Sequence, residues 1–416
     1  MTKLKIVFLC HFSNPMVREK LDLRKMILRS FLSKMKGNSN FIYDDYAIWV
    51  SDYIEEFEKH KECECHIVAP HLGMKRSYQF FDIRGIKYHF WSYKDSIFHL
   101  VVNKLFNIDI RSNYKYNRNK VRSIINKVNP DIVLLCGAEN PYYSLAALDV
   151  NSIPIYVILQ TFLNDSKRIK MGVGNDYSRK IELNIFRHAN YFCTSNENAI
   201  NYLMTNNNKA TILPAGFPTH RPNVMVQKKK DYDFVFFART VTVNKGVEDA
   251  LRALSIIKEK GNFTLNVIGG IEDSYHQYLV DLCEKLDISD CVFFSGYYKS
   301  IQETYDNVVR SRIVVVPGIT AALNSTIRES MFMGMPVICY ETEATKIINK
   351  DQKCLFTAIM SDVSSLAEQM LMATEDNIRT QEVAWNGKNY AESMFGNEAI
   401  VNKLIDNCFN IVKNQF

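Results

Sequence analysis

Apolar runs of five to eight residues recur along the chain, and amphipathic stretches separate them. Most runs are continuously apolar, which is typical of strands buried on both faces of a sheet. Strands that alternate with helical stretches favour parallel sheets covered by helices. The sequence therefore predicts an α/β protein with two doubly wound, Rossmann-like domains. The expected strands lie in residues 5–12, 65–70, 86–91, 131–137, 154–161, 191–195, 210–216, 232–238, 263–270, 291–296, 312–318 and 336–340.

The length of the chain, 416 residues, is too great for one ordinary hydrophobic core, so two domains are expected. Residues 214–233 contain three prolines and a lysine triplet, and we interpret them as the linker between the domains. The predicted organisation is an N-terminal domain over 1–218, a C-terminal domain over 219–390 and a last amphipathic helix within 391–416.

The composition, with 47% hydrophobic and 23% charged residues, predicts a globular protein. A net charge of +6 is too small to indicate nucleic-acid binding by itself, but it is compatible with anionic phosphates or lipids. The ten cysteines form no CxxC pair, which favours buried, reduced thiols. No signal-peptide pattern and no apolar run of bilayer length occur, so we expect a cytoplasmic protein, free or peripheral to the membrane.

Two cations follow the predicted strand 232–238. Arg239 and Lys245 are six residues apart, and Gly246 opens the next amphipathic helix. In open α/β sheets this edge binds ligands, and two cations with a helix N-terminus suit a diphosphate. The alternative is a pair of solvated loop cations. Gly269, Gly270 and Gly318 also end predicted strands, where they would let a ligand approach the backbone or would simply form turns.

A second segment, TAALNSTIRESMFMGMPV, joins the predicted strands 312–318 and 336–340. Glu329 falls near the start of its helix, where a carboxylate can accept hydrogen bonds from ribose hydroxyls. The alternative is structural, because Thr326 and Glu329 fit a capping box. Gly334 and Pro336 are expected to end this helix. The small and polar residues that would let backbone amides approach the ligand are Ala321, Ala322, Leu323, Asn324, Ser325 and Thr326.

Polar residues at strand ends in the first half are candidates for binding a second substrate. His11 ends the first predicted strand, and Glu139 and Asn140 follow the strand in 131–137. Each residue could instead be a structural polar group. We find no sequence pattern typical of a metal site.

Residues 98–127 carry seven lysines and arginines against one acid, Asp109, and aromatic residues are interleaved with them. Such a segment can lie in a lipid headgroup layer, or it can be an ordinary exposed basic helix and loop. Contact with an anionic membrane is therefore a hypothesis for this segment.

The residues from Tyr232 to Tyr340 resemble the C-terminal half of retaining glycosyltransferases with the GT-B fold, family four in the usual classification. The similar positions are Arg239, Lys245-Gly246, Gly269 and the block from Glu329 to Val337. The resemblance implies two domains facing across a cleft, a final helix that crosses back to the first domain, and no metal requirement. It also implies that Arg239 and Lys245 hold the donor diphosphate and that Glu329 holds the ribose.

Ala321 departs from this pattern, because the family usually has a second glutamate there, in contact with the donor sugar. The first loop, HFSNPMV, and the sequence VILQTF also lack the family's glycines and histidine. The hypothesis is thus a glycosyltransferase that uses a nucleotide-diphosphate sugar of the UDP or GDP type and no other cofactor. The acceptor would be a glycan or a lipid-linked glycan in cell-surface polysaccharide assembly. A nucleotide-sugar epimerase and a catalytically silent nucleotide-sugar binding protein of the same fold are the alternatives.

Overall fold

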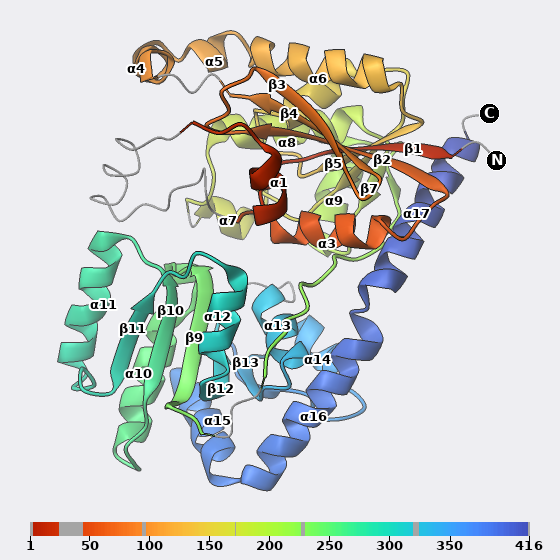
Figure 1. The fold of residues 1–416 in the computed structure, drawn as a ribbon. Coiled ribbons are helices and arrows are strands. Elements are labelled where there is room, and N and C mark those ends of the chain that lie inside the picture. The colour runs from red at the N-terminus through yellow and green to blue at the C-terminus, as the bar shows by residue number, and fades with distance from the viewer. Residues whose placement is uncertain are drawn as a thin grey trace. The chain divides into compact units, whose positions relative to one another are not determined.

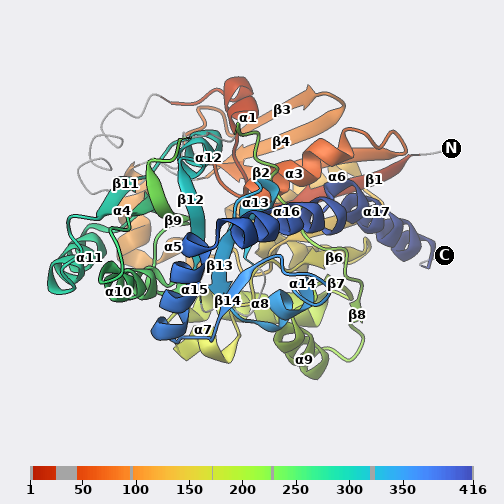
Figure 2. The same ribbon diagram turned by 90° about the horizontal axis from the view of Figure 1, so that it is seen from below.

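The computed structural model describes residues 3–24, 45–93, 97–170, 172–225, 229–318 and 324–414. They form two compact units (Figures 1 and 2). Unit 1 contains the described residues up to Pro218 together with those from Asn397 onward. Unit 2 contains Thr219–Gly396.

Unit 1 is built on an eight-stranded sheet with the order β3-β4-β2-β1-β5-β6-β7-β8. All neighbouring strands are parallel except β3, which pairs antiparallel with β4 at the edge. The strands are β1 (Leu4–Leu9), β2 (Cys63–His71), β3 (Tyr78–Ile83), β4 (Ile86–Ser92), β5 (Ile132–Cys136), β6 (Ile155–Ile158), β7 (Tyr191–Cys193) and β8 (Thr211–Ile212).

Helices cover both faces of this sheet, which explains why its central strands are apolar without alternation. In β1, Ile6 and Phe8 belong to one core, which includes α3 and α17, whereas Val7 and Leu9 belong to the core that includes α6 and α8. The helices of unit 1 are α1 (Pro15–Lys20), α3 (Ile48–Phe57), α4 (Ile97–Phe106), α5 (Ile108–Arg111), α6 (Lys115–Val128), η1 (Ser144–Asp149), α7 (Ser166–Lys170), α8 (Asp176–His188), α9 (Glu197–Asn206) and α17 (Asn397–Lys413).

Unit 2 is built on a six-stranded parallel sheet with the order β11-β10-β9-β12-β13-β14. Its strands are β9 (Tyr232–Thr240), β10 (Leu265–Gly270), β11 (Val292–Gly296), β12 (Ser311–Val316), β13 (Val337–Tyr340) and β14 (Phe356–Ala358). Its helices are η2 (Val243–Lys245), α10 (Val247–Lys258), α11 (Asp273–Lys285), α12 (Ile301–Val308), α13 (Ser325–Phe332), α14 (Glu343–Ile348), α15 (Val363–Glu375) and α16 (Asn377–Met394).

The predicted fold class, two doubly wound α/β units, is confirmed. Every strand expected from the apolar runs is present, but β3 and β14 were missed. β3 is an edge strand that alternates between half-buried and exposed residues, and Phe80 is exposed. β14 has only three residues, so neither strand produces a continuous apolar run of sufficient length.

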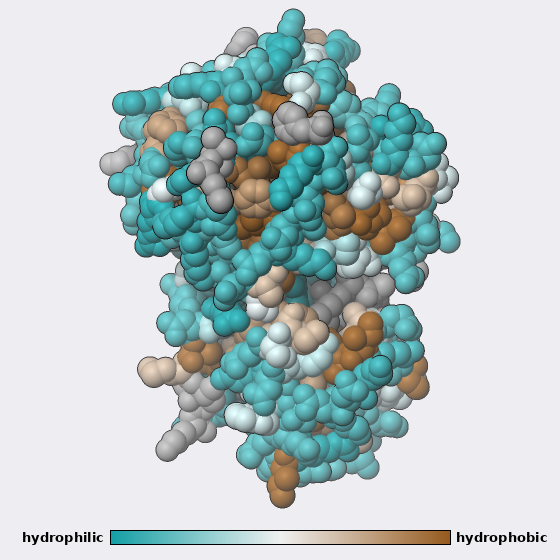
Figure 3. Space-filling model, turned by 90° about the vertical axis from the view of Figure 1, so that its right-hand side faces the viewer, coloured by the Kyte–Doolittle hydropathy of each residue, from teal (hydrophilic) through white to brown (hydrophobic). Residues whose placement is uncertain are grey.

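All ten cysteines are free and buried, as predicted. Within the described part of the chain, no helix combines the length and the apolarity that a membrane span needs. On the side that faces the viewer in Figure 3, where α17 lies, hydrophilic residues predominate and apolar residues gather in separate areas.

Candidate functional site

The strand order of unit 2 reverses between β9 and β12. From β9 the chain proceeds through β10 to β11 on one side and then returns to β12 on the other. At such a switch point the loops after the two strands diverge and leave a crevice at their carboxyl ends, where α/β proteins bind ligands. Arg239 lies at the end of β9 and is exposed, and Gly318 follows β12 by two residues. The predicted residues therefore lie at the switch point.

Two glycines allow the loops at this edge to pack backbone against backbone. Gly246 has φ +80°, and a Cβ atom on it would lie 2.1 Å from the carbonyl oxygen of Pro317, directly after β12. Gly269 has φ +144°, and its Cβ would lie 2.0 Å from the carbonyl oxygen of Ala238 in β9. No side chain fits at these distances, so the close approach of the strand ends requires glycine at both positions.

The loop that carries Lys245 lies beside Gly318. A Cβ atom on Gly318 would be 3.7 Å from the carbonyl oxygen of Lys245 and 3.9 Å from Nδ2 of Asn324. Gly270 is on the other side of β9, where its carbonyl oxygen accepts a 2.8 Å hydrogen bond from the N–H of Val241. The structure thus brings the backbones at Arg239, Lys245, Gly269, Gly270 and Gly318 together at one edge of the sheet.

Glu329 is the fifth residue of α13, and its side chain is partly buried. The capping-box interpretation with Thr326 is wrong. The helix begins at Ser325, one residue before Thr326, and Asn324 is its N-cap. Asn324 Oδ1 accepts a 2.9 Å hydrogen bond from the N–H of Thr326. Glu329 is therefore too far along the helix to cap it, and a structural reason for this carboxylate is removed.

The other predicted residues of this loop divide into two groups. The N–H of Thr326 donates its hydrogen bond to the Asn324 side chain, so this N–H is already paired within the protein. Ser325 is exposed. Ala321, Ala322 and Leu323 lie outside the described residues. Gly334 has φ +66° directly after α13, as the expected helix end requires.

Unit 1 has a switch point of its own between β1 and β5. His11 follows β1, and Glu139 follows β5. The imidazole of His11 lies over the ring of Tyr143, with centroids 6.5 Å apart. A Cβ atom on Gly137 would be 3.1 Å from both Glu139 Oε2 and the Tyr143 hydroxyl. His11 and Glu139 therefore both lie close to Tyr143.

The Glu139 carboxyl group is buried, and within the described part of the chain its Oε2 atom has no hydrogen-bond partner. The pKa of Glu139 is raised to about 7, first by burial and then by the negative charge of Glu182. The backbone N–H groups of Glu139 and Ala138 and the charge of Arg168 oppose these effects. Near neutral pH the group therefore exchanges a proton readily, which is a property of functional carboxyls.

His11 is neutral at physiological pH, because burial and then the neighbouring His71 lower its pKa to about 4. Its Nε2 atom is 2.9 Å from the Tyr93 hydroxyl. Asn140, in contrast, has a structural role. Its Oδ1 accepts a hydrogen bond from the N–H of Tyr142, and its own N–H donates to Ser144 Oγ. Of the three residues predicted for the second substrate, His11 and Glu139 thus share the switch point, and Asn140 shapes the turn beside it.

Sequence reasoning missed Tyr93, Tyr143 and Glu182 at this edge. Tyr143 donates to the carbonyl oxygen of Cys136, and Glu182 accepts from the N–H groups of Leu163 and Asn164. The run CGAENPYY, directly after a strand, could have pointed to Tyr143. Glu182 belongs to an amphipathic helix, and nothing in its local sequence distinguishes it from a surface residue.

The buried carboxyl of Glu139 predicts a pH dependence of stability. Its pKa is about 7 in the folded protein and 4.5 in the reference state, so the folded state binds the proton more tightly. Stability is then full below pH 4.5 and falls as the pH rises to about 7, by about 3 kcal/mol. We expect Glu139→Gln to remove this loss. Urea unfolding of both proteins at pH 5 and pH 8 measures the change.

An exposed glutamate, Glu392, provides the control. The Glu392→Gln variant should follow the wild-type pH dependence, whereas the Glu139→Gln variant should gain in relative stability at pH 8. If stability changed with pH equally in the wild type and in Glu139→Gln, the pKa of the Glu139 carboxyl would not be raised by folding.

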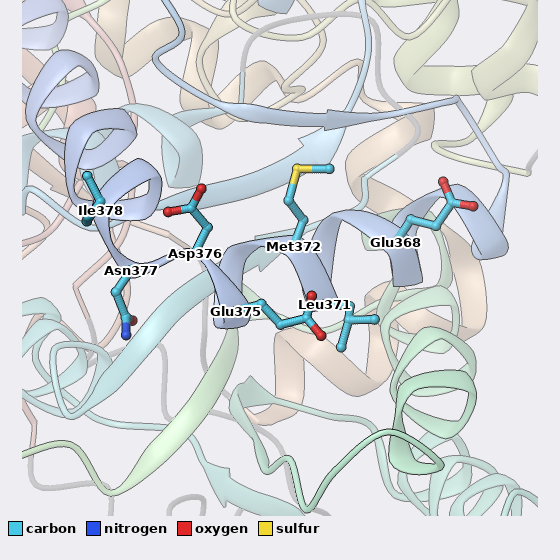
Figure 4. A pocket seen from close by; sticks show the side chains of 7 residues that line it. All are labelled: Glu368, Leu371, Met372, Glu375, Asp376, Asn377 and Ile378. Carbon is cyan, nitrogen blue, oxygen red and sulfur yellow. The ribbon is translucent and has the colours of Figure 1, made fainter.

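A pocket of about 650 Å³ lies elsewhere in unit 2, along α15 and the start of α16 (Figure 4). Arg312, at the beginning of β12, donates a 3.0 Å hydrogen bond to Asn377 in the wall of this pocket. The pocket is therefore at the amino ends of the strands, opposite to Arg239 and Lys245. Its charged lining residues are all acidic, so it does not suit a diphosphate. They are Glu368, Glu375 and Asp376.

Two doubly wound units, the second with Arg239 and Lys245 in the segment that follows β9 at the switch point, have the layout of the GT-B fold. Comparison with known proteins agrees. Residues 222–390 match the family described as "Glycosyl transferases group 1". An uncharacterized glycosyltransferase of Methanocaldococcus jannaschii, MJ1607, is 32% identical over 109 residues, which are 26% of this chain and 27% of the relative. The chain therefore aligns with about a quarter of that relative's length.

Solved structures share the fold over nearly the whole chain. Sucrose-phosphate synthase from Thermosynechococcus elongatus has a TM-score of 0.67 and 12% identity, and the match covers 99% of this chain and 100% of that one. HepE of Anabaena, in complex with UDP and glucose, has a TM-score of 0.62 and 12% identity, with coverage of 98% and 100%. A glycosyltransferase from Rickettsia africae has a TM-score of 0.60 and 15% identity, with full coverage of both chains.

Proposed function

We propose that this protein is a glycosyltransferase that moves a sugar from a nucleotide-diphosphate donor to a glycan or lipid-linked glycan. The observation that carries the proposal is the switch point of unit 2, where Arg239 ends β9 and the close packing at Gly246 places the Lys245 loop beside Gly318. The family matched by residues 222–390 supports transfer, and the neighbour solved with UDP supports a nucleotide donor. The setting we propose is cell-surface polysaccharide assembly at the cytoplasmic face of the membrane.

In the proposed reaction, the guanidinium of Arg239 and the ammonium of Lys245 bind the diphosphate. Negative charge grows on that group as its bond to the sugar breaks, so fixed cations stabilise the transition state more than the ground state. Glu329 accepts hydrogen bonds from the ribose. The acceptor hydroxyl bonds to the anomeric carbon on the face that the phosphate leaves, and the departing phosphate takes its proton. The configuration is thus retained, and no metal ion takes part in the proposed step. UDP and GDP sugars are the donors we propose.

The acceptor is proposed to bind at the unit 1 switch point, near His11, Glu139 and Asn140. His11 is uncharged, and no described residue bonds the buried Oε2 atom of Glu139, so both groups could pair with the hydroxyls of an acceptor that reaches them. An epimerase would need acid–base groups around the donor sugar, and a silent binding protein would release no nucleotide. The family match favours transfer over both alternatives.

The test combines binding with turnover. Calorimetry with UDP, GDP, ADP and their glucose conjugates identifies the nucleotide, and nucleotide release with added glycans measures transfer. Glu329→Gln should weaken binding about tenfold by loss of charged hydrogen bonds to the ribose. Glu368→Gln, in the pocket at the opposite edge, should bind like the wild type. The proposal would be abandoned if the wild type bound none of these nucleotides or if both variants behaved alike.

A further inference from the structure

The helices α4 and α5 expose a group of large apolar side chains. Five residues within ten positions are between 39% and 69% exposed. Figure 1 shows α4, α5 and α6 in a row along one side of the unit 1 sheet. We call this group the α4–α5 surface. It comprises Val101, Leu105, Phe106, Ile108 and Ile110. Such a concentration of exposed apolar residues on a water-soluble surface indicates an interaction site.

Basic residues border the α4–α5 surface at Arg111 and Lys115 and continue along α6. Between residues 97 and 127, Asp109 is the only acidic residue, and its carboxylate is 3.2 Å from Nε2 of His99. Arg118 is paired with Asp149 of η1, so its charge is compensated. The basic residues that remain exposed are Arg111, Lys115, Arg122 and Lys127. An apolar surface bordered by cations is complementary to the boundary between anionic headgroups and acyl chains.

Aromatic rings connect this surface with the acceptor edge. Tyr114 directly precedes α6, and its ring centroid is 5.1 Å from that of Tyr142. The rings of Tyr142 and Tyr93 are 4.4 Å apart, and the Tyr93 hydroxyl bonds His11. All these residues belong to unit 1. Ring contacts within unit 1 thus connect Tyr114, four residues after Ile110 in the chain, with His11 beyond the end of β1.

We propose that the α4–α5 surface inserts into the headgroup layer of an anionic bilayer and so brings the unit 1 switch point to a lipid-linked acceptor. The choice of acceptor class rests on the proposed function, whereas bilayer binding does not. Val101, Leu105, Phe106, Ile108 and Ile110 enter the boundary with the acyl chains. Arg111 and Lys115 contact the headgroups. The acceptor sugar then reaches His11 and Glu139 past Tyr142.

Vesicle flotation of the full chain tests bilayer binding. The vesicles contain phosphatidylcholine alone or phosphatidylcholine with 30% phosphatidylglycerol, a composition of about one anionic lipid in three that is typical of a strongly charged leaflet. Wild-type protein should float with the anionic vesicles, with at least about tenfold weaker binding to the neutral ones. The double variant Leu105→Glu/Phe106→Glu should bind the anionic vesicles about tenfold or more weakly than the wild type. Arg111→Glu should bind them about fivefold or more weakly.

Ile378→Glu in α16 is the matched control, because Ile378 is 83% exposed and belongs to unit 2. This variant should float like the wild type. Nucleotide calorimetry on every variant separates the bilayer proposal from the proposed function, because none of these substitutions should affect the donor site. The bilayer proposal would be overturned if the wild type and the double variant floated equally, or if the wild type bound neutral and anionic vesicles equally. It would also be overturned if the wild type did not float but self-associated, and the double variant abolished that self-association. Loss of nucleotide binding by the wild type would overturn only the proposed function.

The acceptor class is tested by transfer to two probes, methyl glucoside and dodecyl glucoside in anionic vesicles. The wild type should transfer sugar to dodecyl glucoside about tenfold or more faster than to methyl glucoside. This preference should disappear in Leu105→Glu/Phe106→Glu. Equal rates with both probes would show that the acceptor does not come from the bilayer.

Discussion

Replacing Gly246 by alanine should destabilise unit 2 by about 4 kcal/mol or more and abolish nucleotide binding. The new Cβ would lie 2.1 Å from the carbonyl oxygen of Pro317 and 2.7 Å from its carbon, and both are backbone atoms that cannot rotate away. The left-handed φ of +80° adds about 1–2 kcal/mol for any residue with a Cβ. Relief requires β12 and the Lys245 loop to separate, which would destroy the switch point. Urea unfolding and nucleotide calorimetry measure the two effects.

Two other glycines of unit 2 separate the causes. Gly296 has φ +74° and nothing within 4 Å of its Cβ position, so Gly296→Ala should show the conformational cost alone. Gly318 has no positive φ and its nearest neighbour would be at 3.7 Å, so Gly318→Ala should be nearly neutral for stability. If Gly246→Ala were no worse than Gly296→Ala, the close contact of the two loops would not exist in solution.

Removing both cations, Arg239→Ala with Lys245→Ala, should weaken binding of the preferred nucleoside diphosphate by about a hundredfold or more. Hydrogen bonds to charged groups contribute about 1.5–3 kcal/mol each, and a doubly charged diphosphate loses both. Arg239→Lys should recover only part of the affinity, because lysine lacks the planar fork of arginine. Calorimetry at 50 mM and 300 mM salt checks the result, since the wild type should be the more salt-sensitive protein.

The control for charge is Lys258→Ala. Lys258 is at the C-terminal end of α10, where it pairs with Asp287 and Asp290 and is remote in the fold from the carboxyl ends of the strands. This variant removes one positive charge from the same unit and should bind the nucleotide normally. A similar loss of affinity in Lys258→Ala would mean that general charge, and not the position of Arg239 and Lys245, determines binding.

The fold was predictable because its sheets are covered on both faces, so strands such as β5 are apolar at every position. The helix α10 was predictable for a related reason. Its buried residues Val247, Leu251, Leu254 and Ile257 repeat at helical spacing before a stop at Gly261. The antiparallel strand β3 was not predictable, because an edge strand half open to solvent produces no comparable signal.

The donor site was predictable as a set of residues but not as a geometry. That Arg239 and Lys245 follow a strand could be read locally. The collision partners of Gly246 and Gly269 could not, since Pro317 is 71 positions further along the chain from Gly246. The capping-box alternative placed the N-cap at Thr326, two residues after the observed cap, Asn324. Asn324 and Thr326 are both good caps, and only the start of α13 decides between them.

The acceptor side depends still more on tertiary structure. The raised pKa of Glu139 comes from burial and from Glu182, which lies on α8, more than 40 positions along the chain. The contacts of Tyr142 with Tyr93 and Tyr114 join three separate loops. Sequence patterns describe how one segment is built, and they contain little information about which segments meet.

The position of α17 has a consequence for the order in which the protein matures on the ribosome. Its buried face, with Leu404 and Cys408, completes the core under β1, and Asn407 Nδ2 donates to the Tyr156 hydroxyl across 251 positions. The 178 residues Thr219–Gly396 are translated in between, which takes roughly 10–35 s at ordinary rates of protein synthesis. During that interval an apolar area of the nascent first unit stays uncovered. Unit 1 is therefore the part of the nascent chain that most needs a chaperone, although its sheet is synthesised first.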